Sequence, residues 1–150
     1  MTAEGRGGPL RHRERTRARA WALQVHYRWE AGGKSGSLLE SLDETLQNRY
    51  VAPPRRPYLR RLIRTLDSHL EEVDRELKAC LENWRLDRLA TIDRGVLRIG
   101  ATEILFMDDI PPKVSLKEAV RLAERYGSDE SSGFVNGVLD ALAARCESSS

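Results

Sequence analysis

Apolar residues recur at intervals of three or four along most of this chain, and this spacing limits what it can fold into. Positions three or four apart share one face of an α-helix, whereas a half-buried strand needs a period of two. The clearest run consists of Leu59, Leu62, Leu66, Leu70, Val73, Leu77, Leu81 and Trp84. No segment sustains the alternation of a strand, so the pattern predicts an all-α fold.

Start and stop signals divide this pattern into about seven helices. An amphipathic first helix contains residues 18–29 and stops at the glycine-rich "AGGKSGS". Ser37 followed by Glu40 fits a capping box, which predicts a second helix that ends near Asn48. Pro57 suits the first position of a third, long helix that carries the whole leucine run.

The second half of the chain carries further signals of the same kind. We expect a short turn at residues 86–90 and a helix over residues 92–107. Ser115 and Glu118 fit a second capping box at the start of the next helix. Gly127 is expected to end that helix in a left-handed conformation.

The length of 150 residues predicts one domain, which is large enough to bury a sizeable core. We expect a compact helical bundle over residues 10–146, in two packed halves of about 10–83 and 84–146. A disordered lead over residues 1–9 and a frayed end over residues 147–150 would flank it.

The charge is unevenly distributed along the chain. Residues 1–61 contain 13 Lys and Arg against 6 Asp and Glu, whereas residues 62–150 contain 12 against 17. A basic and an acidic surface suggest two different partners.

Signatures of catalysis, metal binding and membrane insertion are absent from the sequence. Cys80 and Cys146 lack any CxxC spacing, and we expect free thiols in a reducing compartment. The histidines show no ligand spacing, and no Walker, GxGxxG or GxSxG motif occurs. The longest apolar run, residues 104–107, cannot span a bilayer. We therefore expect a cytoplasmic protein that is not an enzyme and has no cofactor, metal or membrane partner.

The strongest functional signal is an arginine comb, with arginine at every second position. It consists of Arg11, Arg13, Arg15, Arg17 and Arg19. A period of two spreads side chains around a helix, so we expect a surface exposed all round or a flexible arm. Guanidinium groups pair with phosphate oxygens, which favours salt-dependent nucleic-acid binding. Trp21 and Tyr27 adjoin the comb and could stack on unpaired bases, whereas the spacing of Trp29 favours the core.

The segment "SSGFVNGVLDAL" is a second unusual feature. Gly133 and Gly137 interrupt a helical pattern, each at a cost of about 1 kcal/mol relative to alanine. Two readings stay open: a ligand approaches the glycines with Phe134 as a stacking platform, or the helix packs tightly with Phe134 in the core.

Several segments in combination resemble the NusB family of bacterial transcription antitermination factors. They are "RARAWALQVHYRWE", "IPPKV", "EAVRLA" and "FVNGVLD". The resemblance covers residues 13–31 and 84–143. It implies an all-helical protein that binds single-stranded boxA RNA of nascent ribosomal RNA transcripts as a heterodimer with the ribosomal protein NusE, within the antitermination complex of RNA polymerase.

The resemblance also implies roles for individual residues. Arg15, Arg17 and Arg19 match an arginine-rich RNA-binding motif, and Tyr27 matches its following aromatic. Phe134 matches an RNA-contacting phenylalanine. Two acidic positions, Asp87 and Asp93, match the surface that faces the ribosomal protein. Gly133 stands where the family often has lysine, and Arg11 and Arg13 could compensate for that lost phosphate contact.

Two alternative functions stay open. A helical protein–protein adaptor would use the basic segment on an acidic protein and would not protect RNA. The chain could also be a stand-alone relative of the N-terminal RNA-binding domain of ribosomal RNA cytosine methyltransferases, although its length leaves no room for their catalytic domain. The sequence leaves open whether the free protein forms a homodimer.

Overall fold

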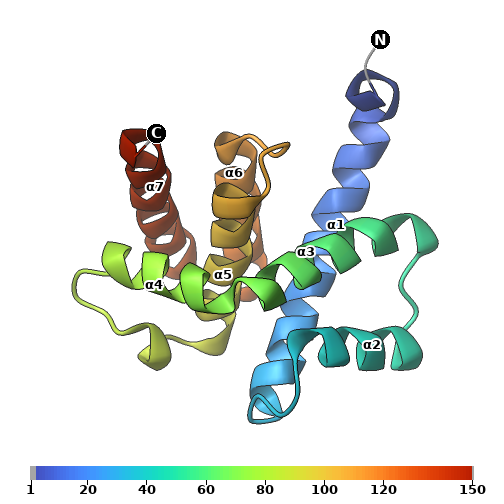
Figure 1. The fold of residues 1–150 in the computed structure, drawn as a ribbon, viewed down its shortest axis with the longest axis horizontal. Coiled ribbons are helices and arrows are strands. Elements are labelled where there is room, and N and C mark those ends of the chain that lie inside the picture. Colours follow the sequence, from blue (N-terminus) through green and yellow to red (C-terminus); the bar gives the residue numbers. More distant parts are fainter. Residues whose placement is uncertain (1–2, 150) are drawn as a thin grey trace. The chain divides into compact units, whose positions relative to one another are not determined.

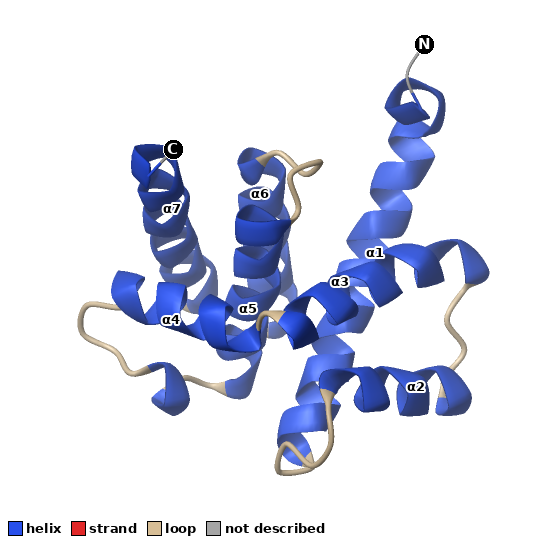
Figure 2. Ribbon diagram, in the orientation of Figure 1, coloured by secondary structure: helices blue, strands red, loops and turns tan. Residues whose placement is uncertain are grey.

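The computed structural model describes residues 3–149, with side chains from residue 8 onward. All regular secondary structure in these residues is helical (Figure 1). The elements are α1 (Ala3–Ala31), α2 (Leu38–Asn48), η1 (Pro53–Arg55), α3 (Arg56–Ser68), α4 (Leu70–Cys80), η2 (Leu86–Arg88), α5 (Thr91–Phe106), α6 (Pro112–Tyr126) and α7 (Ser131–Ser149). Between residues 3 and 149 no strand occurs (Figure 2). The prediction of an all-α fold with about seven helices is confirmed. In the described part of the chain, no helix is both long and apolar enough to cross a membrane.

The chain divides into two compact units, and the division lies between Arg64 and Thr65, inside α3. The sequence pattern predicts the boundary between the two halves later, at about residues 83 and 84. The difference arises because α4 packs against α5 and α7 and therefore belongs to the second unit.

The first unit is organised around α1. The predicted apolar stripe is buried, with Ala18, Ala22 and Val25 fully covered and Trp29 only 8% exposed. Helix α2 packs against it, and the Ser41 hydroxyl donates a hydrogen bond of 2.9 Å to the Val25 carbonyl. Helix α1 already begins at Ala3, where a disordered lead over residues 1–9 was expected; residues 1 and 2 lie outside the described residues.

The start of α2 was predicted correctly. The Ser37 hydroxyl accepts a hydrogen bond of 3.1 Å from the backbone N–H of Glu40, and the helix ends at Asn48. The preceding loop is closed by the Trp29 indole, whose Nε1 donates to the Gly36 carbonyl at 3.1 Å.

The predicted single long helix after Pro57 is wrong, because His69 separates α3 from α4. The His69 ring stacks on Phe106 with centroids 4.0 Å apart, and its Nδ1 donates to the Thr65 carbonyl at 2.9 Å. The backbone N–H of His69 is shared between the carbonyls of Thr65 and Leu66. The spacing of three or four between apolar residues continues from α3 into α4. The sequence pattern therefore gives no sign of the break at His69.

The second unit is built around α5, which packs against α4, α6 and α7. All residues from 94 to 103 are buried, so this helix has no solvent-facing side over that stretch. Its arginines need internal partners, because a buried unpaired charge is costly. Arg98 makes a bidentate ion pair with Asp74 of α4, with both N–O distances at 2.9 Å.

The expected capping box at Ser115 is wrong. Helix α6 begins at Pro112, where a proline at the first position loses no hydrogen bond. Ser115 and Glu118 are therefore buried inside the helix rather than placed at its start. The last helix is also longer than expected, since α7 continues to Ser149 where fraying was predicted from residue 147.

Gly127 ends α6 for a different reason from the one expected. Its φ of −93° is not left-handed. A Cβ atom at this position would lie 2.6 Å from Cβ of Ser131 and 2.8 Å from the carbonyl oxygen of Ala123. Glycine is needed here because the chain leaves no space for a side chain.

This difference predicts opposite effects for two substitutions. Gly127→Ala should lower the free energy of unfolding by about 1–3 kcal/mol through overpacking. Gly137→Ala, where an added Cβ meets no atom within 4 Å, should raise it by about 1 kcal/mol through helix propensity. Urea unfolding of both variants measures this; a Gly127→Ala protein as stable as wild type would contradict the packing argument.

Candidate nucleic-acid interface

The helical conformation of α1 divides the arginine comb into two rows. Each residue turns an α-helix by about 100°, so every second position alternates between opposite sides. The inner row is Arg11, Arg15 and Arg19, and the outer row is Arg13 and Arg17. Arg19 is only 2% exposed, Arg11 and Arg15 are half-buried, and both outer-row arginines are exposed. The comb is therefore neither exposed all round nor a flexible arm.

Two arginines of the inner row, Arg15 and Arg19, pack against the ring of Tyr58 on α3 together with Arg61 of the same helix. The guanidinium carbons of Arg15 and Arg19 lie 4.6 and 5.4 Å from the ring centroid, and that of Arg61 lies 5.9 Å from it. These distances are those of cation–π contacts. Because Arg19 is buried in this cluster, its guanidinium supports the packing of α1 and does not face solvent.

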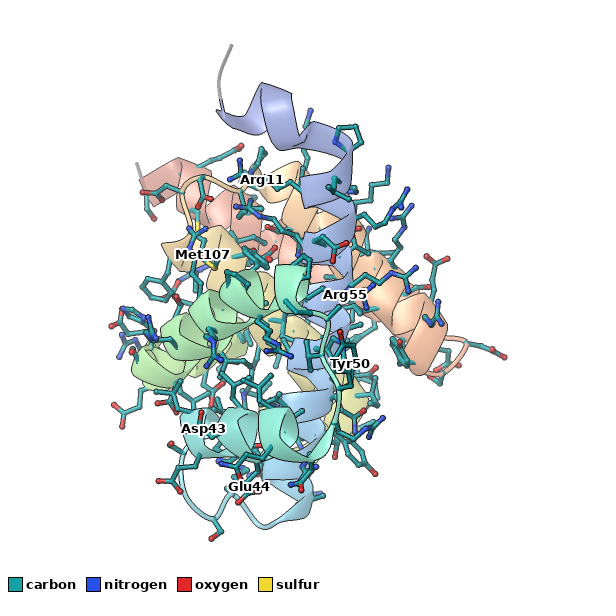
Figure 3. All side chains as sticks on the ribbon, turned by 90° about the vertical axis from the view of Figure 1, so that its right-hand side faces the viewer. Arg11, Asp43, Glu44, Tyr50, Arg55 and Met107 are labelled. Carbon is teal, nitrogen blue, oxygen red and sulfur yellow. The ribbon has the colours of Figure 1, made fainter. Side chains whose placement is uncertain are left out.

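An open groove lies beside this cluster, and we call it the arginine groove. It measures about 420 Å³ and is lined by Leu10, Arg11, Glu14, Arg15, Pro54, Pro57, Tyr58 and Arg61. Glu14 is held by Arg55 of η1 at 3.0 Å. Figure 3 shows Arg11 projecting from the upper part of α1 and Arg55 beside the same helix. The groove therefore combines an apolar floor with a rim of guanidinium groups, and sequence reasoning did not include Arg61.

The outer row has a different environment. Among the residues whose side chains are described, no ion pair is recorded for Arg13 or Arg17. Their guanidinium groups are available to anions in solvent. Tyr27, on the same helix, is 47% exposed and could present its ring to a ligand, whereas Trp29 is buried, as its spacing predicted.

A second surface lies in the second unit, and we call it the aromatic pocket. It measures about 180 Å³ and is lined by Trp84, Arg88, Leu89, Ala90, Asp93, Ser128, Glu130, Ser131 and Phe134. The rings of Trp84 and Phe134 meet edge to face, with centroids 6.0 Å apart and planes at 71°. Trp84 is 61% exposed. Phe134 is thus a pocket wall rather than a core residue.

Hydrogen bonds connect the segments that line the pocket. Arg94 of α5 donates from Nη1 to the carbonyls of Leu86 and Leu89, at 3.2 and 2.7 Å, and so ties η2 to α5. On the opposite side, the Ser131 hydroxyl accepts a hydrogen bond of 2.9 Å from the backbone N–H of Ser128. These bonds hold η2 against α5 and the start of α7 against the preceding turn.

The two predicted partner-binding acids lie in different environments. Asp87 is exposed and pairs with Arg85 at 3.0 Å. Asp93 is half-buried and lines the aromatic pocket together with Phe134. The Oδ1 atom of Asp93 is buried and has no hydrogen-bond partner. Sequence reasoning assigned Trp84 to the leucine stripe and missed its place beside these residues.

Gly133 and Gly137 flank Phe134 in the sequence of α7, and both are exposed. An added Cβ would meet no atom within 4 Å at either position. Close packing among the described residues therefore does not account for either glycine.

The cysteines take no part in either surface. Cys80 and Cys146 are free thiols. Burial raises the pKa of both thiols, which favours the unreactive protonated form. The described residues contain no cluster of three or more His, Cys, Asp or Glu side chains that could hold a metal ion.

Comparisons with known proteins show what the chain is similar to. The sequence pattern of the NusB family matches residues 16–144. The chain is 39% identical over 125 residues to the transcription antitermination protein NusB of Desulfitobacterium hafniense, covering 83% of this chain and 84% of that protein. It is also 39% identical over 133 residues to the protein of that name from Myxococcus xanthus, covering 86% and 94%. A crystal structure of antitermination factors NusB and NusE in complex with dsRNA contains a chain that is 30% identical, with a TM-score of 0.77 over 89% of this chain and 98% of that one.

Proposed function

The chain belongs to the NusB family, and from this premise we propose that it is a transcription antitermination factor that binds boxA-like RNA together with NusE. The observation that carries the proposal is the division of the arginine comb. Arg15 and Arg19 pack against Tyr58, while Arg13 and Arg17 are exposed on the opposite side of α1. A helix that needed only stability would not require the second row.

Phosphate contacts supply most of the affinity in this proposal. Arg13 and Arg17 reach solvent directly, and Arg11 and Arg15 reach it at the rim of the arginine groove. A guanidinium group pairs with two phosphate oxygens at once. Such contacts fix the position of the RNA backbone but do not distinguish sequences.

Base contacts supply the choice of sequence. Phe134 and the exposed ring of Tyr27 are the aromatic surfaces on which unpaired bases would stack. Single-stranded RNA suits these contacts better than a duplex, because stacked and paired bases cannot reach a side chain.

The protein partner in this proposal is NusE, which was crystallised with a similar chain and RNA. Asp87 is exposed on the acidic second unit, and its ion pair with Arg85 is a surface pair that exchanges at little cost. A basic partner would take the place of Arg85. The protein would act in the cytoplasm by binding within the RNA polymerase antitermination complex rather than by catalysis.

The two rows of the comb should respond differently to mutation. If four arginines neutralise four phosphates, the slope of log binding constant against log salt is about −2.8, and a fourfold rise in salt weakens binding roughly fifty-fold. Arg13→Gln with Arg17→Gln should reduce the slope to about −1.4 for boxA and scrambled RNA alike. Filter binding at several salt concentrations measures both slopes.

Arg19→Met serves as the matched control. It removes a guanidinium from the same helix but from the buried cluster around Tyr58. It should lower the melting temperature and leave the slope near its wild-type value. A slope that changes equally in both variants would argue against the division of roles.

Phe134→Ala should reduce discrimination between boxA RNA and a scrambled RNA of the same length. The reason is that the ring contacts a base, whereas the phosphate contacts remain intact. Competition binding with both RNAs measures the ratio, and Tyr126→Ala, an exposed aromatic outside the pocket, is the control. An equal loss of affinity for both RNAs would count against a base contact.

A further inference from the structure

Helix α3 carries a second group of exposed arginines, and we propose that this group binds the phosphates of RNA that flanks the boxA-like element. We call it the α3 arginine face; it consists of Arg60, Arg61 and Arg64, all of which are exposed. The proposal rests on the proposed RNA-binding function and extends it to a surface that the arginine comb does not include.

The first observation is the charge of this part of the chain. Residues 45–66 contain six arginines and no Asp, Glu or Lys. Arg49, Arg55 and Arg56 contact other residues of the first unit. The other three form the α3 arginine face. Contacts within the fold therefore account for only part of this arginine-rich segment.

The second observation is the spacing of the arginines along α3. Arg56, Arg60 and Arg64 follow one another at intervals of four, so they share one face of the helix. Like charges at this spacing repel each other and destabilise a helix. Within the described part of the chain, neither Arg60 nor Arg64 has an ion-pair partner. Neither lies in the last turn, where the helix dipole favours a cation. A bound polyanion would remove this repulsion.

The third observation is that the α3 arginine face continues the arginine groove. Arg61 lines that groove together with Arg11 and Arg15 of α1. Arg61 and Arg64 are three positions apart and are therefore neighbours on the surface of α3. An RNA backbone held at the rim by Arg11 and Arg15 would meet Arg61 in the same groove and Arg64 one turn further along α3. This continuity favours RNA over an acidic protein segment as the occupant.

The chemistry of the face favours phosphate groups over bases. Its charged groups are guanidinium groups, each of which pairs with two phosphate oxygens at once. The neighbouring ring of Tyr58 is only 7% exposed and is covered by Arg15, Arg19 and Arg61, so it offers no stacking surface. The face therefore adds affinity and salt dependence without distinguishing sequences.

Two RNAs test this proposal: the boxA-like element alone, and the same element extended by oligouridylate on both sides. If the α3 arginine face neutralises three additional phosphates, the slope of log binding constant against log salt should be steeper by about 2.1 for the extended RNA. In Arg60→Gln with Arg64→Gln this difference should fall to about 0.7, because Arg61 alone remains. The slope for the short RNA should not change. Filter binding at several salt concentrations measures all four slopes.

Arg75→Gln with Lys78→Gln is the matched control, since it removes two exposed cations three positions apart on α4 of the second unit. It should leave the difference between the two RNAs at about 2.1.

A thermal melt of Arg60→Gln without RNA at low salt gives a second readout. Because the substitution relieves repulsion from Arg56 and Arg64, the melting temperature should equal or exceed that of the wild type. A lower melting temperature would show that Arg60 supports the fold and would contradict the proposal.

The outcomes separate this inference from the proposed function. A wild-type protein that does not bind the short RNA at low salt would overturn both. Binding of the short RNA with equal slopes for the two RNAs, or a difference that persists in the double variant, would overturn only the role of the α3 arginine face. Oligouridylate should abolish the difference at a lower concentration of charges than poly-aspartate does. The reverse order would assign the face to an acidic protein partner.

Discussion

The rotation of an α-helix by about 100° per residue is the constraint on which the first unit depends. Because of it, arginines at every second position cannot share one environment. Arg15 and Arg19 pack against Tyr58 and hold α1 to the start of α3. Arg13 and Arg17 point the other way and remain exposed. One short sequence pattern thereby supplies both a packing contact and a charged surface, without a separate basic tail.

The interior of the second unit contains buried charged side chains. Helix α5 is buried over residues 94–103, yet it contains arginines that need partners. Arg98 is neutralised by Asp74, and Arg94 donates to the carbonyls of Leu86 and Leu89. The second contact holds η2 against α5 and so positions the pocket that contains Trp84. Core stability and the geometry of the proposed base site therefore depend on the same helix.

The sequence predicted the helices more accurately than their ends or their neighbours. Apolar spacing identifies buried faces, so the fold class and the core position of Trp29 were predictable. Spacing could not reveal the break at His69, because the leucine stripe continues through it. It could not reveal that Gly127 is required by Ser131, since that contact depends on how the chain turns back. The comb was recognised as basic, but the burial of Arg19 depends on Tyr58, far away in sequence. The aromatic pocket was not predicted, because its lining residues also come from distant parts of the sequence.

The central proposal is that boxA-like RNA binds through phosphate contacts with the outer row of the arginine comb and through a base contact with Phe134. Titration of the isotope-labelled protein with boxA RNA, followed by backbone amide NMR signals, tests it directly. The account predicts that the signals of Arg13, Arg17 and Phe134 shift together and saturate with one dissociation constant at one equivalent of RNA. Shifts confined to one region, or two regions that saturate at different RNA concentrations, would contradict it.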